Sequence, residues 1–175
     1  MGRDKALLAF RETTFLEHLI AVLSPRVDPL VVVLGHHAES IRRVIPNGPR
    51  VVVNPDYKQG MLTSLQAGIR ELPATAESVV FTLVDHPAVA AETVDLLVGE
   101  YEKTKSLIAI PQHGERRGHP VIAARSVLDE IVALPPDSSA KEVIRSHRDE
   151  TLFVDTDDPG VLWDIDLPAE YDKLR

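Results

Sequence analysis

The chain has 175 residues, a formal charge of −8 and no cysteine, and these properties exclude several classes of protein. Without cysteine there is no disulfide, no thiolate metal site and no cysteine nucleophile. The acidic balance, with no dense block of Lys or Arg, argues against a nucleic-acid partner, whose phosphates would need to be neutralised. The N-terminal apolar run is too short for a signal peptide and no stretch reaches the roughly 20 apolar residues of a membrane span, so we expect a cytoplasmic protein with no membrane partner.

Apolar patterning predicts alternating helices and strands along the first two thirds of the chain. Apolar residues at helical spacing over 12–23 predict a helix that Thr13 or Thr14 caps. Short and nearly continuous apolar runs predict strands that are covered on both faces. The predicted strands are 30–35, 50–55, 79–84 and 106–111, and the predicted helices are 37–45, 61–71 and 91–103.

The last third of the chain is less regular. Residues 113–124 predict a loop that runs into an edge strand, and helices near 125–133 and 139–147 and a short strand at 151–155 follow. There is no repeat and no low-complexity linker, which predicts a single domain over 1–175. The order of elements predicts an α/β fold, with a Rossmann-like, doubly wound and mainly parallel sheet and helices on both faces.

Three predicted strand or turn ends carry small or polar residues. Because Pro87 cannot donate to a sheet ladder, we expect the chain to leave the sheet there and to expose Asp85 at the carboxyl end of its strand. Gly35 and Asn54 end two other predicted strands, and each alone is an ordinary turn residue. In a parallel sheet all three lie along the edge where open α/β sheets bind ligands, so together they predict a crevice.

A second pair of carboxylates lies near the C-terminus, in the segment DIDLP. Asp164 and Asp166 stand at i and i+2, so an extended backbone puts both side chains on one face, where Mg²⁺ could draw them towards Asp85. The alternative is that one of them caps the final helix ahead of Pro168. The acidic run 155–159 is interpreted as a solvated turn rather than a ligand set.

Two further segments offer groups that bind anions. Gly60 provides a flexible turn and Ser64 lies near a helix start, whose free N–H groups favour an anionic or polar ligand, although the same pair is common without a ligand. Arg117 and His119 lie in a loop ahead of a strand, where an Arg fork suits a phosphate or a carboxylate. A solvated surface loop is the alternative for this second segment.

Five short motifs follow one another along nearly the whole chain. They are K-x-L-L at 5–8, N-x(5)-G-M-x-x-S-L-x-x-G at 54–68, D-x-P at 85–87, R-G-H-P at 117–120 and D-x-D-x-P at 164–168. Each motif is weak alone, but the ordered combination is specific. The chain resembles the nucleotidyltransferases of molybdenum cofactor synthesis, and the G-M-x-x-S-L and R-G-H-P forms are most similar to the cytidylyltransferase branch.

The resemblance implies a fold like that of the nucleotide-diphospho-sugar transferases and an Mg²⁺-dependent reaction. The phosphate of a pterin cofactor of the molybdopterin type attacks the α-phosphate of a nucleoside triphosphate, CTP ahead of GTP, and pyrophosphate leaves. By the same resemblance Asp85 would hold the metal, Asp166 would be its second ligand, and Asp164 would lie close by.

The resemblance also implies roles for residues that carry no carboxylate. Lys5 would meet the triphosphate and act with the metal-binding aspartate in catalysis. The nucleotide side would be lined by Gly35, Asn54, Gly60 and Ser64. The acceptor would face Arg117 and His119.

The chain departs from this family at two places. Family members begin with a strand and a glycine-rich phosphate loop that ends on Met-Gly, and this chain starts at that Met-Gly, so the resemblance predicts a sheet without its first strand. We expect a start upstream of Met1 or a truncated chain, with a degenerate form that folds without the loop as the alternative. Val84 replaces a usual glycine, and His86 stands where glutamine is common, which leaves the role of His86 open.

Two other functions are compatible with the same residues. One is a nucleotidyltransferase whose acceptor is a sugar phosphate or a polyol phosphate. The other is a non-catalytic protein on the same fold that binds a nucleotide or docks onto a molybdenum enzyme or its maturation factor.

Overall fold

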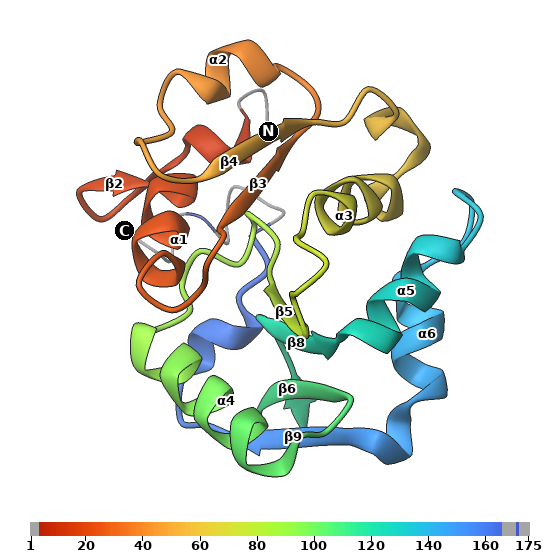
Figure 1. Ribbon diagram of the computed structural model, residues 1–175. Coiled ribbons are helices and arrows are strands. Elements are labelled where there is room, and N and C mark those ends of the chain that lie inside the picture. Colours follow the sequence, from red (N-terminus) through yellow and green to blue (C-terminus); the bar gives the residue numbers. More distant parts are fainter. Residues whose placement is uncertain (1–3, 166–170, 172–175) are drawn as a thin grey trace.

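The computed structural model describes residues 4–165 and residue 171. Helices and strands alternate along this part of the chain, and helices lie on both sides of the sheet that contains β6 (Figure 1). No helix among these residues is long and apolar enough to cross a membrane. Asp166 and the predicted helix start at Pro168 lie outside the described residues.

The elements follow the predicted order, with boundaries shifted by a few residues. The helices are α1 (Phe15–Leu23), α2 (Ala38–Arg42), α3 (Met61–Arg70), α4 (Ala91–Thr104), α5 (Arg125–Ala133) and α6 (Ala140–Ser146). The strands are β1 (Ala9–Phe10), β2 (Thr13–Thr14), β3 (Val31–Leu34), β4 (Arg50–Val53), β5 (Ser78–Phe81), β6 (Ile108–His113), β7 (Arg116–Arg117), β8 (Val121–Ala124) and β9 (Thr151–Asp155). Short 3₁₀ turns occur at η1 (Lys5–Leu7), η2 (Tyr57–Gln59), η3 (Arg148–Glu150) and η4 (Pro159–Leu162).

The start of α1 confirms the predicted threonine cap. Thr14 Oγ1 accepts a hydrogen bond from the Glu17 N–H, and Glu17 Oε2 accepts one from the Thr14 N–H at 2.9 Å. This reciprocal capping box satisfies two of the backbone donors that a helix start leaves free.

Most of the longer strands run in the same direction as a neighbouring strand of their sheet. β3 pairs with β4 in parallel register. In the larger sheet β8 lies antiparallel between β5 and β6, β9 runs parallel to β6, and the short β7 pairs with the end of β6. Strands β5, β6 and β9 therefore share one direction and β8 is reversed, which confirms the predicted sheet.

The predicted edge strand before α5 is instead an interior strand. β8 has paired neighbours on both sides, β5 and β6. Its residues Val121, Ile122 and Ala123 are buried, as expected of an apolar run between two covered faces. The edge prediction is wrong because the place of a strand in a sheet depends on pairing with distant strands, which the residues of this segment do not encode.

The strand before Asp85 is shorter and less covered than predicted. β5 ends at Phe81, and its residues are half-buried rather than covered on both faces. Phe81 pairs with Val121, so the next partner along β8 would be Pro120, which has no N–H to donate. The ladder therefore stops there, and the chain leaves the sheet well before Pro87.

Helices cover the larger sheet on both faces. Ile108 of β6 and Val121 of β8 pack with α3, α5 and α6. The alternate residues Ala109 and Ile122 pack on the other face against Leu97 of α4. This alternation follows from the two-residue period of a strand, and burial of each large aliphatic side chain contributes about 1.5–3 kcal/mol.

One carboxylate of the acidic run 155–159 is part of the scaffold. Asp155 and Asp157 are exposed, as expected of a solvated turn. Asp158 Oδ2, by contrast, accepts hydrogen bonds from the Ala90 N–H at 2.9 Å and the Thr93 hydroxyl at 2.7 Å, and its Oδ1 accepts one from the Gly160 N–H at 2.8 Å. The solvated-turn interpretation is therefore wrong for Asp158, which joins η4 to the positive end of α4.

Replacing Asp158 with Ala should therefore destabilise the fold. The change leaves three donors without their acceptor, so we expect Asp158→Ala to lower the free energy of unfolding by about 2–3 kcal/mol. Asp157→Ala, in the same acidic run, should change it by no more than about 0.5 kcal/mol. Urea denaturation of both variants measures the difference, and equal effects would contradict a structural role for Asp158.

Candidate active site

Asp85 lies in a turn where three distant parts of the chain meet. The His86 N–H closes this turn by donating to the Leu83 carbonyl oxygen at 3.1 Å. Lys5 Nζ, from η1, lies 3.1 Å from Asp85 Oδ2. The Ile165 N–H donates to the Asp85 backbone carbonyl at 2.9 Å, so the N-terminal and C-terminal segments are both held at this turn.

Asp85, His86 and Asp164 form a cluster that could hold a metal ion. One ligand atom from each of the three lies within 4.8 Å of the others. His86 is buried, Asp85 is half-buried and Asp164 is exposed, so the cluster reaches the solvent through Asp164. The predicted pairing of Asp85 with Asp164 fits this geometry, whereas Asp166 lies outside the described residues. Sequence reasoning left the role of His86 open, although its place directly after Asp85 is a signal for a further ligand.

His86 packs against His119, the histidine of the R-G-H-P motif. Their ring centroids lie 4.5 Å apart with the planes tilted by 54°. Burial lowers the pKa of His86 below its ordinary value, although the carboxylates of Asp85 and Asp164 act in the opposite direction. Burial also lowers the pKa of His119 to about 4, and the neighbouring His86 adds to this shift. Both imidazoles are therefore neutral at pH 7.

The carbonyl of Val161 in η4 holds this histidine pair. It accepts a hydrogen bond from the His119 N–H at 3.0 Å, and the His86 ring also hydrogen-bonds to the Val161 backbone. A Cβ at Gly118 would collide with the same carbonyl, so the motif needs glycine at this position to bring the two segments together.

Unpaired buried polar atoms are concentrated at this site. Among the described residues, four of the five buried side-chain polar atoms without a hydrogen-bond partner belong to Thr82, Asp85, His86 and His119. Each such atom costs about 1–3 kcal/mol when nothing satisfies it. Their gathering around one turn indicates a place where a ligand supplies the missing partners.

The residues predicted for the nucleotide side gather around the start of α3. Asn54 Nδ2 donates to the Thr63 hydroxyl at 2.9 Å and to the Ser64 hydroxyl at 3.0 Å. The Thr63 hydroxyl in turn donates to the Gly60 carbonyl at 2.9 Å. Asn54 is buried, so these contacts fix the loop that leads into α3.

Gly35 packs against the segment that leads into α3. A Cβ at Gly35 would collide with the Tyr57 side chain of η2, which is therefore packed directly on the backbone that follows β3. Gly35 thus allows close packing between two strand-end loops.

Arg117 lies apart from its motif partner His119. Its guanidinium stacks over the Phe153 ring, 4.2 Å from the centroid, and the side chain is exposed on β7. Of these two predicted acceptor residues, His119 contacts the Asp85–His86 turn, whereas Arg117 contacts β9.

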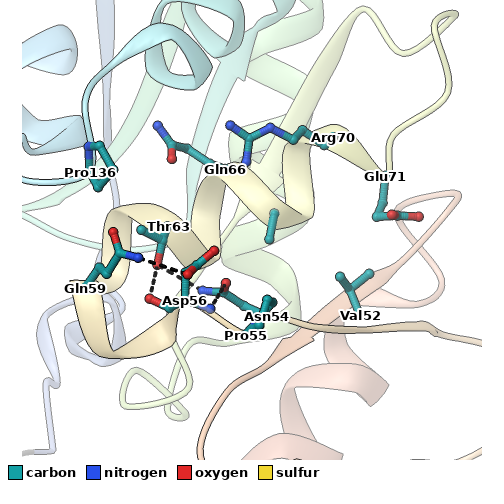
Figure 2. A pocket seen from close by; sticks show the side chains of 11 residues that line it. Val52, Asn54, Pro55, Asp56, Gln59, Thr63, Gln66, Arg70, Glu71 and Pro136 are labelled. Carbon is teal, nitrogen blue, oxygen red and sulfur yellow. Dashed lines mark hydrogen bonds between the residues drawn. The ribbon is translucent and has the colours of Figure 1, made fainter.

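A cavity of about 370 Å³ lies beside α3 rather than at Asp85 (Figure 2). It is lined by Val52, Asn54, Pro55, Asp56, Gln59, Thr63, Gln66, Ala67, Arg70, Glu71 and Pro136. Among its described lining residues only Asn54 is a predicted site residue. For a phosphate-binding site, the presence of side chains that can bind a metal ion or a phosphate is a better guide than the size of a cavity. Among the described residues, such side chains, with buried polar atoms that lack partners, lie at Asp85 and not in this cavity.

The family model for the MobA-like NTP transferase domain matches residues 1–151. The chain belongs to this family. Its members are nucleotidyltransferases, so this MobA-like protein is a nucleotidyltransferase. The fold is the one seen in solved nucleotidyltransferases, which confirms the fold that the motifs implied.

This MobA-like protein is similar to three known proteins, one of which has two structures. It is 22% identical to the molybdenum cofactor cytidylyltransferase of Escherichia coli K12, over 98% of this chain and 86% of that protein. It is 38% identical to the bifunctional IPC transferase and DIPP synthase of Rubrobacter xylanophilus, over 49% of this chain and 20% of that protein. The crystal structure of Rv0371c from Mycobacterium tuberculosis H37Rv is 27% identical, with a TM-score of 0.87, over 99% of this chain and 89% of that chain. A second structure of that protein is described as a complex with manganese, with a TM-score of 0.83 and the same identity.

Because His119 is buried in its neutral form, we expect the free energy of unfolding to fall at acid pH. Its pKa is about 4 in the folded protein and about 6.5 in an unfolded chain, so its contribution to stability is complete above pH 6.5 and is lost as the pH falls towards 4. The loss between pH 7 and pH 4.5 should be about 2 kcal/mol, measured by urea denaturation, and His119→Gln should remove most of this slope.

His147 provides the matched control for this pH dependence. Hydrogen bonds to the Glu150 and Glu130 carboxylates raise the pKa of His147, so its contribution is present at low pH and is lost as the pH rises through the folded pKa. His147→Gln should therefore keep the acid loss. An unchanged slope in His119→Gln would contradict the assignment to His119.

Proposed function

We propose that this nucleotidyltransferase transfers a nucleoside monophosphate, CMP ahead of GMP, to the phosphate of a molybdopterin-type cofactor. A phosphate oxygen of the acceptor attacks the α-phosphorus of the triphosphate, the bond from that phosphorus to the β-phosphate oxygen breaks, and pyrophosphate leaves. The choice of base and acceptor is supported by the likeness to the E. coli cytidylyltransferase along 98% of this chain.

The observation that carries the proposal is the meeting of a cation, two carboxylates and an imidazole at one turn. Charge builds up on phosphoryl oxygens during such a transfer, so the protein contributes mainly positioning and electrostatic stabilisation. Lys5 lies 3.1 Å from Asp85 in this cluster, and an ammonium is a common ligand of triphosphate oxygens.

The donor set at this turn fits a divalent cation, for which Mg²⁺ is the expectation. Asp85 Oδ2 binds Lys5, whereas Oδ1 is buried and has no hydrogen-bond partner, so one oxygen is available to a cation. Asp164 would be a second ligand, and Asp166 remains a further proposed ligand. When bound, the cation would neutralise the charge that develops on the phosphoryl oxygens. The manganese complex of the Rv0371c relative supports a cation site in this fold.

The substrates would lie on opposite sides of the Asp85 turn. The nucleotide would contact the α3 loop held by Asn54 and Ser64, with Gly35 and Gly60 at its edge, because a helix start favours an anionic or polar ligand. The acceptor would face His119, with Arg117 available from β7 to bind its phosphate.

A second candidate acceptor is a sugar phosphate or a polyol phosphate. The observation in its favour is the 38% identity to the bifunctional IPC transferase and DIPP synthase over half of this chain. The transfer step and the residues at Asp85 would be the same, and only the acceptor would differ.

Removal of the Asp85 carboxylate tests the chemistry directly. We expect Asp85→Ala to lower the turnover of CTP with the accepted phosphorylated substrate by about 10²-fold or more, because a principal electrostatic group is lost. Pyrophosphate release measures this rate. Asp137→Ala, in the exposed loop between α5 and α6, is the control and should keep full activity. Near-normal transfer by Asp85→Ala would overturn the role of this carboxylate.

A panel of substrates tests the choice of base and acceptor. With the molybdopterin-type cofactor as acceptor, CTP should give a cytidine dinucleotide product at a higher rate than GTP, ATP or UTP, as identified by mass spectrometry. Product formed only with a sugar phosphate or polyol phosphate would reject the pterin acceptor and favour the second candidate.

A further inference from the structure

We propose that the site of Asp85 and Asp164 takes a first-row transition-metal cation of the Mn²⁺ type in preference to Mg²⁺, with His86 as its third protein ligand. The inference rests on the proposed function, since it concerns the cation of that reaction. It goes further by giving His86 a role and by reversing the expected order of metals.

The geometry brings one nitrogen donor to two oxygen donors. Ligand atoms of Asp85, His86 and Asp164 lie within 4.8 Å of one another. Two donors on opposite sides of one cation, at bond lengths of about 2.0–2.2 Å, stand at most about 4.4 Å apart, so the cluster needs only a small contraction. Asp164 is exposed and lies outside any helix or strand.

A separate observation points to a ligand at His86. His86 is only 7% exposed, yet its Nδ1 has no hydrogen-bond partner among the described residues. We assign the ring proton to Nε2, because Nδ1 has no hydrogen-bond partner and a lone pair on that atom would be open to a cation. An Nε2–H that donates to a carbonyl leaves the lone pair on Nδ1, which is the usual arrangement of a metal-binding histidine.

The surroundings of His86 fix the direction of that lone pair. The His119 ring packs on His86 with centroids 4.5 Å apart, and the His119 N–H donates to the same Val161 carbonyl at 3.0 Å. A ring held by stacking and by one hydrogen bond loses little freedom when a cation binds.

The donor set then determines the metal. Mg²⁺ is a hard cation that prefers an octahedron of oxygens and keeps several waters. First-row divalent cations bind nitrogen donors more strongly than Mg²⁺ does, and the affinity rises along the row from Mn²⁺ towards Cu²⁺. A buried imidazole beside two carboxylates should therefore favour the transition metal.

Direct cation binding tests this inference without any turnover. Isothermal titration of the full chain with MnCl₂ and with MgCl₂ should show Mn²⁺ binding at least about 10-fold more tightly. His86→Gln should weaken Mn²⁺ binding by about 10-fold or more and change Mg²⁺ binding by less than about 3-fold, because it removes the nitrogen donor. His113→Gln is the matched control on β6, where Nδ1 contacts the Thr156 carbonyl, and should leave both affinities unchanged.

Pulsed electron paramagnetic resonance provides a readout on the unmodified protein. Bound Mn²⁺ should show ¹⁴N modulation from a directly coordinated imidazole, and His86→Gln should abolish it. Absence of ¹⁴N coupling in the wild-type protein would overturn the inference whether or not the variant folds. An equal loss of both metals in a folded His86→Gln variant would also overturn it.

The outcomes also separate this inference from the proposed function. Mg²⁺ binding that depends on Asp85 but shows no preference for Mn²⁺ would reject the role of His86 and leave the transferase proposal intact. Failure of both cations to bind, with or without CTP, would reject the metal site in both.

Discussion

The contact between Lys5 and Asp85 is the constraint on which the rest of the site depends. It joins residues 80 positions apart, and the Ile165 N–H binds the backbone of the same aspartate from the other end of the chain. Three segments that no local pattern connects are thereby fixed at one turn. The sheet determines where this turn begins, because the ladder of β5 ends opposite the proline that precedes β8 and the chain then continues into the turn.

The site differs from the scaffold in how its polar groups are satisfied. Asp158 shows the scaffold pattern, because both of its oxygens accept hydrogen bonds and hold η4 against α4. Asp85 and His86 show the opposite pattern, because each is fixed through one atom and leaves another buried and unpaired. A fold tolerates the free-energy cost of unpaired buried polar atoms where a bound ligand supplies their partners. The concentration of these atoms at one turn therefore distinguishes the functional site from the structural part of the fold.

Much of the fold could be predicted because each element is encoded locally. The apolar stripe of α1 and its Thr14 cap, and the apolar runs of β3, β4 and β6, need only neighbouring residues. The interior position of β8 could not be predicted, since strand order depends on distant pairing rather than on composition. The predicted end of β5 is wrong for the same reason: Pro87 follows β5 along the chain, whereas the proline that ends the ladder precedes β8. The motifs predict the position of Asp85. The position of His86 in the site could not be predicted, because it depends on the packing of His119 and Val161, which are distant in sequence.

The central claim is that the Asp85 turn is a metal site for nucleotidyl transfer. The most direct measurement is anomalous diffraction at the manganese edge from crystals grown with MnCl₂ and a non-hydrolysable CTP analogue. The account predicts one strong peak within about 2.0–2.5 Å of Asp85 Oδ1 and His86 Nδ1, with the triphosphate on the same ion. A peak in the acidic cavity formed by Gln112, Asp155 and Asp157, with none at Asp85, would contradict it.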